Sequence, residues 1–142
     1  MDEKVLLVDD EQDFLDTLAE RMRNRDMQVT TSTSAVDAIH KTAAEDFDVI
    51  VLDLQMPGMD GIQALEALKQ RKPDLQVILL TGHATVRKGI EAMKLGAMDL
   101  LEKPADINAL TEKIKKARAQ KMILVEKNAE AKIREIWRTK AW

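Results

Sequence analysis

Short apolar runs that each end in a polar side chain constrain this chain more than any other feature of its sequence. The polar ends are Asp9 and Asp10 after residues 5–8, Asp53 after 49–52, Thr81 after 77–80, and Lys103 two residues after Leu101. Ligands bind outside the carboxyl ends of parallel strands, so we expect these polar residues to meet at one edge of a sheet. Three carboxylates, a hydroxyl and an ammonium in one place predict a site for a divalent cation and a phosphoryl group.

Apolar runs alternate with amphipathic stretches five times along the chain. The predicted strands are Lys4–Val8, Met27–Thr31, Val49–Asp53, Gln76–Leu80 and Met98–Glu102. Several of them are continuously apolar, as is typical of strands buried on both faces, and the stretches between them repeat apolar residues at helical spacing. This pattern predicts an α/β fold, a five-stranded doubly wound parallel sheet with helices on both faces.

Two helix starts are marked by capping residues. Ser34 is followed three residues later by Asp37, and Asp60 is followed three residues later by Gln63. A capping side chain accepts a hydrogen bond from a backbone amide that the first helical turn leaves without a partner. We therefore expect helices to begin after Ser34 and after Asp60.

Composition limits the class of protein. The chain has 142 residues, 45% hydrophobic and 33% charged, which corresponds to one ordinary globular domain with a segment left over. It has no cysteine, which excludes disulfides and thiolate metal sites and fits a reducing compartment. We expect no signal peptide, because the first apolar run begins at Val5, and no apolar stretch approaches the ~20 residues of a membrane span. We expect a soluble, cytoplasmic protein without membrane contact.

The net charge of −3 hides two oppositely charged parts. Residues 1–110 carry 12 Lys and Arg against 21 Asp and Glu, a net charge of −9, whereas residues 111–142 carry 10 against 4, a net charge of +6. We expect a domain over residues 1–119 and a helical extension over residues 120–142. Charge asymmetry of this kind separates two physically different segments.

The extension predicts a long exposed helix. No Gly or Pro occurs from Ala105 to Trp142, so the last helix of the domain can continue to about Trp137. Its apolar set changes from Leu110, Ile114 and Ala117 to Met122, Val125, Ala129, Ile133 and Ile136. A free helix would also expose Ile123, Leu124 and Trp137, and apolar exposure on this scale usually marks an interface.

Three roles for the extension remain open at this stage. Dimerisation through paired extensions ranks first, docking to a partner protein second, and a linker to a missing output domain third. Direct DNA binding by the basic face is disfavoured, because a charge run is more often a solvated helix face and no DNA-reading motif fits into this segment.

The polar residues at the strand ends suggest specific chemistry. Asp53 is the candidate nucleophile, because a carboxylate that attacks phosphorus gives an acyl phosphate. Asp9 and Asp10 would repel each other and Asp53 unless a cation neutralised them, and Mg²⁺ prefers a few carboxylates together with a phosphate oxygen. Each residue also has an alternative without a role in chemistry. The acidic pair would favour the helix dipole, Thr81 would be an ordinary strand residue, and Lys103 would be a surface lysine.

The order and spacing of these residues resemble the receiver domain of two-component response regulators, a flavodoxin-like fold. The resemblance covers roughly residues 4–118 and rests on Leu-Leu-Val-Asp-Asp-Glu, Leu-Asp-Leu-Gln-Met-Pro-Gly-Met-Asp-Gly, Leu-Leu-Thr-Gly-His and Gly-Ala-Met-Asp-Leu-Leu-Glu-Lys-Pro. The segment from Thr81 to Pro104 is most similar to receivers of the nitrogen-regulatory and nitrogen-fixation classes. In this family the Lys-Pro bond is often cis.

The resemblance implies a reaction and roles for the site residues. A sensor histidine kinase or phosphotransfer protein would pass the phosphoryl group from its phosphohistidine to Asp53, and a downstream target protein would read the result. Asp10 and Asp53 would bind Mg²⁺ directly, Gln55 would contribute its backbone carbonyl, and Asp9 would act through a bound water. Thr81 and Lys103 would contact the phosphoryl group, and Thr81 would move with residue 100 as the switch.

Residue 100 departs from the usual pattern of the family. Most receivers carry Tyr or Phe where this chain has Leu100, and this chain has no Tyr and only two Phe, Phe14 and Phe47. The usual readout through an aromatic side chain is therefore in doubt here.

Gln55 and His83 are expected to set the lifetime of the acyl phosphate, because they would flank the path of an attacking water. His40 is expected on a helix surface.

Alternative functions explain fewer of these residues. A phosphatase of the haloacid dehalogenase type needs a general acid two residues after its nucleophilic Asp, and that position is Gln55 here. A nucleotide-binding flavodoxin-like protein would need a Gly-rich loop after the first strand, where this chain has Asp9-Asp10-Glu11. A phosphorylation-independent scaffold that acts through the last helix is a further alternative. We expect a switching module rather than an enzyme with turnover.

Overall fold

The structure is a computed structural model that describes residues 2–82 and 86–140, without the side chains of Val86 and Lys140. Strands and helices alternate along the described chain. They are β1 (Lys4–Val8), α1 (Gln12–Arg23), β2 (Gln28–Ser32), α2 (Ala35–Ala44), β3 (Val49–Leu52), α3 (Gly61–Arg71), β4 (Gln76–Thr81), α4 (Val86–Lys94), β5 (Asp99–Glu102) and α5 (Ile107–Lys140).

The five strands form one parallel sheet in the order β2-β1-β3-β4-β5, which confirms the predicted fold class. Strand order reverses between β1 and β3, and there the register pairs Val8 with Leu52. The first carboxylates after these two strands, Asp9 and Asp53, are therefore brought side by side at the carboxyl edge of the sheet. This is the switch point at which open α/β sheets bind ligands.

Some strand boundaries differ from the prediction by one residue. β2 begins at Gln28, because Met27 donates its amide to the Met22 carbonyl at 3.3 Å and so belongs to the turn that closes α1. β3 ends at Leu52, because the Asp53 side chain accepts from the Gln55 amide at 3.1 Å and the chain turns there. β4 extends to include Thr81.

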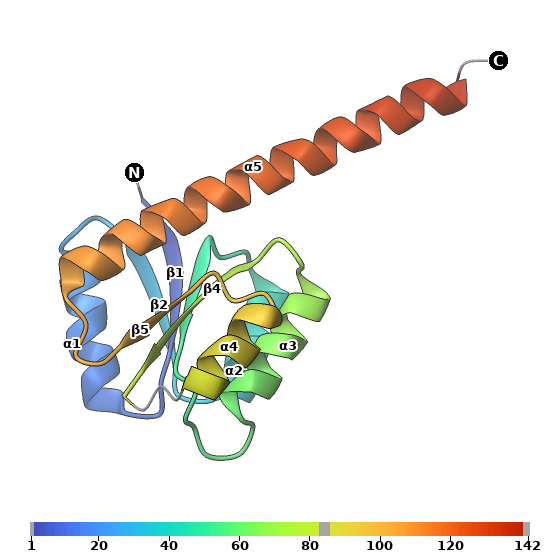
Figure 1. The fold of residues 1–142 in the computed structure, drawn as a ribbon. Helices are drawn as coiled ribbons and strands as arrows, with labels where there is room; N and C mark the ends of the chain where they lie inside the picture. Colours follow the sequence, from blue (N-terminus) through green and yellow to red (C-terminus); the bar gives the residue numbers. More distant parts are fainter. Residues whose placement is uncertain (1, 83–85, 141–142) are drawn as a thin grey trace.

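Helices cover both faces of the sheet (Figure 1). On one face, α1 and α5 cover an apolar layer that includes Leu15, Met22 and Ile114. On the other, α2, α3 and α4 cover a layer that includes Ile39, Leu65 and Ala92. Every residue of β3 is buried, because its side chains alternate between the two layers. The core thus fixes the strand ends that carry the polar residues.

The predicted helix starts are confirmed. The Ser34 side chain accepts from the Asp37 amide at 3.1 Å, and the Asp60 side chain accepts from the Ile62 amide at 3.0 Å. Each contact satisfies an amide that the first helical turn would leave without a partner.

The last helix continues without a break across the predicted boundary between residues 119 and 120. α5 has 34 residues, about 50 Å at 1.5 Å per residue, and it projects well beyond the sheet (Figure 1). It ends at Lys140, three residues after the predicted end at Trp137. Leu110, Ile114 and Ala117 are buried, as predicted. Among the described helices, none is long and apolar enough to cross a membrane.

The first part of the extension is held against the body of the domain. Lys121 Nζ donates to the Phe47 carbonyl at 2.8 Å, and Asn128 Nδ2 donates to Asp74 Oδ2 at 2.8 Å. Phe47 and Asp74 precede β3 and β4, so the extension leaves the domain at the edge opposite to the polar strand ends. Leu124 is half-buried rather than exposed, because it shares a helix face with Lys121 and Asn128.

Gly61 tests how closely the start of α3 packs against the segment that follows β3. A Cβ added at Gly61, the first residue of α3, would lie 2.4 Å from Leu54 Cα. Gly61→Ala should therefore lower the free energy of unfolding by about 1–3 kcal/mol through overpacking, although alanine is the better helix former. Urea denaturation of the purified variant measures this.

Gly82→Ala is the matched control for the glycine prediction. Apart from its two chain neighbours, no atom of the described residues lies within 4 Å of a Cβ built at Gly82. Its effect should stay within about 0.5 kcal/mol. Equal stability of Gly61→Ala and the original chain would contradict the close approach of α3 to residue 54.

Candidate functional site

Three carboxylates gather where β1 and β3 end. Asp9 and Asp10 follow β1, Asp53 follows β3, and one oxygen from each lies within 4.8 Å of the other two. Asp9 and Asp53 are buried, with 3% and 5% of their surface exposed, whereas Asp10 is exposed. Burial of two carboxylates beside a third is costly unless positive charge or hydrogen bonds compensate.

Backbone amides hold the two buried carboxylates in the same way. Asp9 Oδ1 accepts from the Glu11 amide at 2.9 Å, and Asp53 Oδ1 accepts from the Gln55 amide at 3.1 Å. Each is a local turn in which an Asp side chain binds the amide two residues on. The Oδ1 atoms are thus engaged by the backbone, and the Oδ2 atoms are directed to other partners.

Lys103 supplies the compensating positive charge. Its Nζ lies 2.5 Å from Asp9 Oδ2 and 3.5 Å from Asp53 Oδ2. The sequence predicts a pairing with Asp53, and the structure shows that Asp9 is the nearer partner. The Phe14 ring of α1 contacts the same ammonium, with 4.2 Å between the ring centre and Lys103 Nζ.

The Lys103 ammonium is stabilised in its charged form. Burial by itself would lower the pKa of Lys103, but the hydrogen bond to Asp9 and the negative charge of Asp53 outweigh burial and leave the pKa above the ordinary 10.5. The ammonium is therefore charged at every pH at which the protein is expected to work.

Thr81 and Lys103 come from neighbouring strands. Thr81 is the last residue of β4 and is fully buried. Its carbonyl accepts from the Lys103 amide at 2.8 Å, which joins the end of β4 to the segment after β5. The Lys103-Pro104 bond is cis. The structure therefore brings Thr81 and Lys103 to the carboxyl edge that also holds the three carboxylates.

The other residues predicted for the site differ in how far they are exposed. Gln55 is exposed next to Asp53, and His40 is exposed on α2, as predicted. His83 lies outside the described residues. Leu100 is half-buried on β5 and lines an open groove of about 540 Å³ with Gly89, Ile90, Met93 and Lys94 of α4. At the position where the resemblance leads us to expect an aromatic side chain, the structure thus has an aliphatic one beside an open groove.

Sequence reasoning missed the contact between Phe14 and Lys103. The helical spacing marks Phe14 only as part of the apolar face of α1, and nothing in that spacing points to a residue after β5. The contact depends on α1 and the β5–α5 connection lying on the same side of the sheet. An aromatic residue a few positions after the acidic pair is the signal from which it can be sought.

The described residues fit a hard divalent cation. Carboxylate oxygens are the ligands that Mg²⁺ prefers, and the exposed Asp10 leaves one side of the cluster open to solvent and to waters of hydration. Three carboxylates against one ammonium leave the cluster net negative, so it attracts a cation. The same ammonium offers an anion, such as a phosphoryl group, a positive charge beside Asp53.

Removal of the Lys103 charge should destabilise the fold. Lys103→Met would leave buried carboxylates without their cation, so the free energy of unfolding should fall by the order of 3 kcal/mol at neutral pH without added metal. Because the pKa of Lys103 is raised in the folded state, its contribution is complete below pH 10.5 and is lost as the pH rises through the folded-state value. Urea denaturation of both proteins across this range measures the difference.

Lys72→Met is a matched control for Lys103→Met. Lys72 pairs with Asp46 at 2.8 Å, but 83% of the Asp46 side chain is exposed. Exposed pairs of this kind contribute about 1 kcal/mol at most. Equal losses in both variants, or a Lys103→Met difference that does not shrink in strong alkali, would contradict the role of Lys103 in the cluster.

Comparison with known proteins reveals relatives and similar structures. The chain is 36% identical over 110 residues to the photosynthetic apparatus regulatory protein RegA of Cereibacter sphaeroides, covering 78% of this chain and 60% of the relative. It is 39% identical over 106 residues to the transcriptional regulatory protein FixJ of Azorhizobium caulinodans, covering 75% of this chain and 50% of the relative. The chain therefore spans 60% or less of the length of these relatives.

Solved structures agree with the sequence comparison. A response regulator receiver domain from Clostridium thermocellum has a TM-score of 0.82 and 31% identity, covering 86% of this chain and 98% of that chain. A chain described as adenylate cyclase from Rhodopirellula baltica has a TM-score of 0.85 and 29% identity, covering 93% of this chain and 98% of that chain. The family model for the response regulator receiver domain matches residues 5–115, which is most of the chain. The chain belongs to the response regulator receiver family of two-component signalling proteins.

Proposed function

We propose that Asp53 of this receiver accepts a phosphoryl group from the phosphohistidine of a sensor histidine kinase or a phosphotransfer protein. The observation that carries the proposal is the position of the Asp53 carboxylate, which the Gln55 amide holds at 3.1 Å and which faces the Lys103 ammonium at 3.5 Å. Membership of the receiver family supports the same reaction. A phosphatase of the haloacid dehalogenase type is disfavoured, because Gln55 stands where such an enzyme needs a general acid.

The chemistry follows from the positions of these residues. A carboxylate oxygen of Asp53 forms a bond to phosphorus, the bond between phosphorus and the histidine nitrogen breaks, and its electron pair returns to the imidazole. Lys103 neutralises charge on the phosphoryl oxygens, and the Thr81 hydroxyl donates a hydrogen bond to one of them. Such transfers depend on positioning and charge stabilisation more than on covalent assistance.

The acid cluster is the proposed magnesium site. Asp10 and Asp53 would bind the ion directly, Gln55 through its backbone carbonyl and Asp9 through a water molecule. When bound, Mg²⁺ supplies charge neutralisation at the phosphoryl oxygens and at the carboxylates. The proposal is supported by the three carboxylates within 4.8 Å of one another.

The signal would be a shift between two conformations. A new dianionic group on Asp53 attracts the Lys103 ammonium and the Thr81 hydroxyl, so it favours the conformation in which both close on it. Leu100 would follow Thr81 as the second switch residue, and Gln55 and His83 would set the lifetime of the acyl phosphate. The protein would act in the cytoplasm on a downstream target protein, as a switch without substrate turnover.

Intact mass measurement tests the phosphoacceptor proposal. Incubation with Mg²⁺ and acetyl phosphate should add one phosphoryl group that is labile in base. Asp53→Asn should abolish the adduct, because the amide is a poor nucleophile, and Asp10→Asn should raise the Mg²⁺ concentration that the reaction needs, because a metal ligand is lost. Asp16→Asn, an exposed acid on α1, is the control that should leave the adduct unchanged.

Failure of the adduct has a clear meaning. Without a base-labile adduct from acetyl phosphate, or from a phosphohistidine donor, Asp53 is not the acceptor. A phosphorylation-independent scaffold would then account better for the chain. An adduct that persists in Asp53→Asn would place the acceptor elsewhere.

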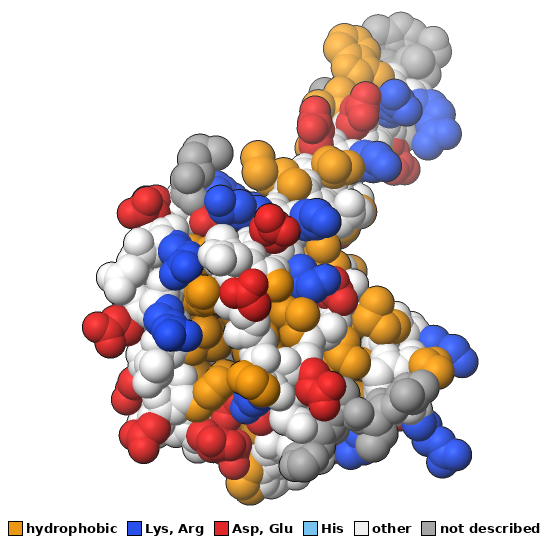
Figure 2. Space-filling view, turned by 60° about the vertical axis from the view of Figure 1, so that its left-hand side comes forward, with side chains coloured by type: hydrophobic (Ala, Val, Ile, Leu, Met, Phe, Trp, Pro, Cys, Tyr) orange, Lys and Arg blue, Asp and Glu red, His pale blue; other side chains and the backbone are white. Residues whose placement is uncertain are grey.

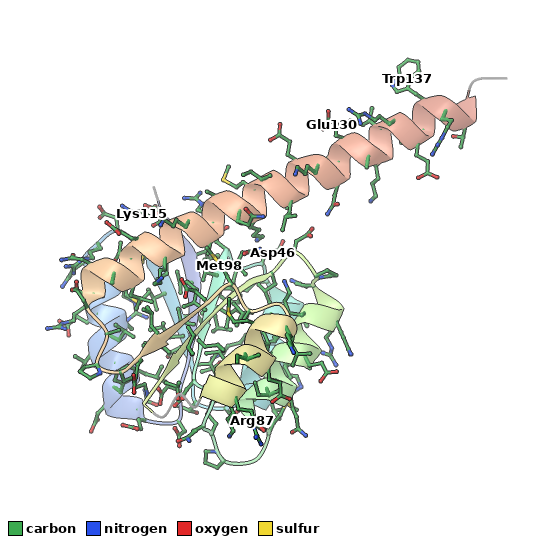
Figure 3. All side chains as sticks on the ribbon, in the orientation of Figure 1. Asp46, Arg87, Met98, Lys115, Glu130 and Trp137 are labelled. Atoms are coloured by element: carbon green, nitrogen blue, oxygen red, sulfur yellow. The ribbon has the colours of Figure 1, made fainter. Side chains whose placement is uncertain are left out.

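A second observation supports dimerisation through α5. Beyond residue 120, α5 exposes Met122, Ile123, Val125, Ile133, Ile136 and Trp137. Figure 2 shows hydrophobic side chains along the part that projects from the body, and Figure 3 shows Trp137 near its far end. Successive members of the set Met122, Val125, Ala129, Ile133 and Ile136 are three or four residues apart, so they form one stripe that a second copy of the same helix would cover.

Mass against concentration tests the paired helices. Sedimentation equilibrium should show a dimer, and Ile133→Lys should weaken it at least tenfold, since about 1.5 kcal/mol or more of apolar burial would be lost. Ala131→Lys introduces the same charge at an exposed position outside the stripe and should change the dimer little. A monomer at all concentrations would favour docking to a different protein.

A further inference from the structure

We propose that Phe14 is a positioning residue that holds the Lys103 ammonium between Asp9 and Asp53. The inference rests on the proposed phosphoacceptor function and assigns a role to a residue outside the acid cluster. Phe14 lies in the first turn of α1, and Lys103 lies after β5, so the contact joins two distant segments. The centre of the ring is 4.2 Å from Lys103 Nζ.

The contacts around the ammonium explain what the ring contributes. The three N–H donors of a lysine ammonium need partners when the group is shielded from water. Asp9 Oδ2 at 2.5 Å and Asp53 Oδ2 at 3.5 Å are two of them, and the face of the Phe14 ring is a third site of negative potential. Only 16% of the Lys103 side chain is exposed, and shielding of this kind strengthens a cation–π contact.

The packing around the ring shows why another side chain would not serve equally well. A cavity of about 10 Å³, lined by Phe14, Asp9, Asp53 and apolar neighbours, lies beneath the cluster. It is at the lower limit of space for one water molecule, so the ring keeps this side of the cluster almost dry. A cavity of about 130 Å³, lined by Phe14, Pro104 and Leu110 among others, lies on the α5 side. Without the ring, Lys103 gains room to turn away from Asp53.

A purely structural role for Phe14 fits the structure less well. The core face of α1 is made by Leu15, Ala19 and Met22, which are buried, whereas Phe14 is only half-buried. Its ring packs against the rim of the apolar layer and also faces a charged group, the Lys103 ammonium. Before phosphoryl transfer, the ring would thus keep the positive charge where the new negative charge will appear, which is preorganisation of the site.

Phosphorylation kinetics with matched variants test the proposal. Phe14→Leu removes the ring but keeps an apolar side chain. Its rate of phosphorylation by acetyl phosphate with Mg²⁺ should fall roughly threefold to thirtyfold, the factor that corresponds to a cation–π contact of a shielded ammonium. Phe14→Trp keeps an aromatic face and should restore most of the rate. Phe47→Leu removes the other phenyl ring, which lies 5.5 Å from Lys4 Nζ at the opposite edge of the sheet, and should leave the rate unchanged.

A double variant separates positioning from general loss of structure. In a Lys103→Met background, Phe14→Leu should have no further effect on the rate, because the ring acts through the ammonium. An equal loss in both backgrounds would overturn the proposal. So would a Phe14→Leu protein that reacts as fast as the original chain.

An NMR measurement tests the contact independently of any phosphorylation. An aromatic ring shields protons above its face, so the methylene protons next to Lys103 Nζ should be shifted upfield in the original chain and in Phe14→Trp, and not in Phe14→Leu. Unshifted protons in the original chain would overturn the proposal. Shifted protons in a chain that takes up no phosphoryl group would uphold the contact and count against the proposed function of Asp53.

Discussion

The bridge between one ammonium and two buried carboxylates is the interaction on which the site depends. Parallel pairing of β1 with β3 places Asp9 and Asp53 side by side. The buried residues of both strands are packed in the core, so the two carboxylates cannot move apart without disrupting it. Their repulsion has to be balanced locally, and Lys103 does so at 2.5 Å and 3.5 Å. The same balance makes the site responsive, because a cation or a new anionic group at Asp53 changes what Lys103 is attracted to.

Much of this arrangement could be predicted from the sequence, because it depends on strand ends. Apolar runs define the strands, the alternation with helices makes them parallel, and parallel strands bring Asp9, Asp53 and Thr81 to one edge. The predicted boundaries were wrong by one residue at several strand ends; at Met27 and Asp53 the reason is a local turn that competes with the strand.

The rest depends on contacts between elements that periodicity does not specify. Helical spacing assigns Phe14 to the inner side of α1 but cannot tell that its neighbour is a lysine from the connection after β5. In the same way, an apolar stripe predicts that the extension of α5 is exposed, but it does not show that Asn128 binds Asp74 on the way out. Such partners follow only when the packing of helices on the sheet is known.

The site and the extension lie at opposite edges of the sheet, and α5, which begins four residues after Lys103, runs from one to the other. Its buried face, Leu110, Ile114 and Ala117, packs against the layer beneath the central strands. Between the site and the extension, Lys113 of α5 forms an ion pair with Asp99, the first residue of β5 and the residue just before Leu100. Further along, the Phe47 carbonyl binds Lys121 at 2.8 Å.

These contacts matter for signalling because residue 100, where we expect the switch, is aliphatic in this chain. Leu100 has neither a ring nor a hydroxyl to present to a partner, and it lines an open groove with α4. Its neighbour Asp99, in contrast, is bound directly to α5, so a movement of β5 is opposed or followed by a long, stiff helix. The same helix carries the exposed apolar stripe, so the ion pair connects β5 to the element that bears this surface. The structure thus gives β5 a more direct polar connection to α5 than to the groove on α4.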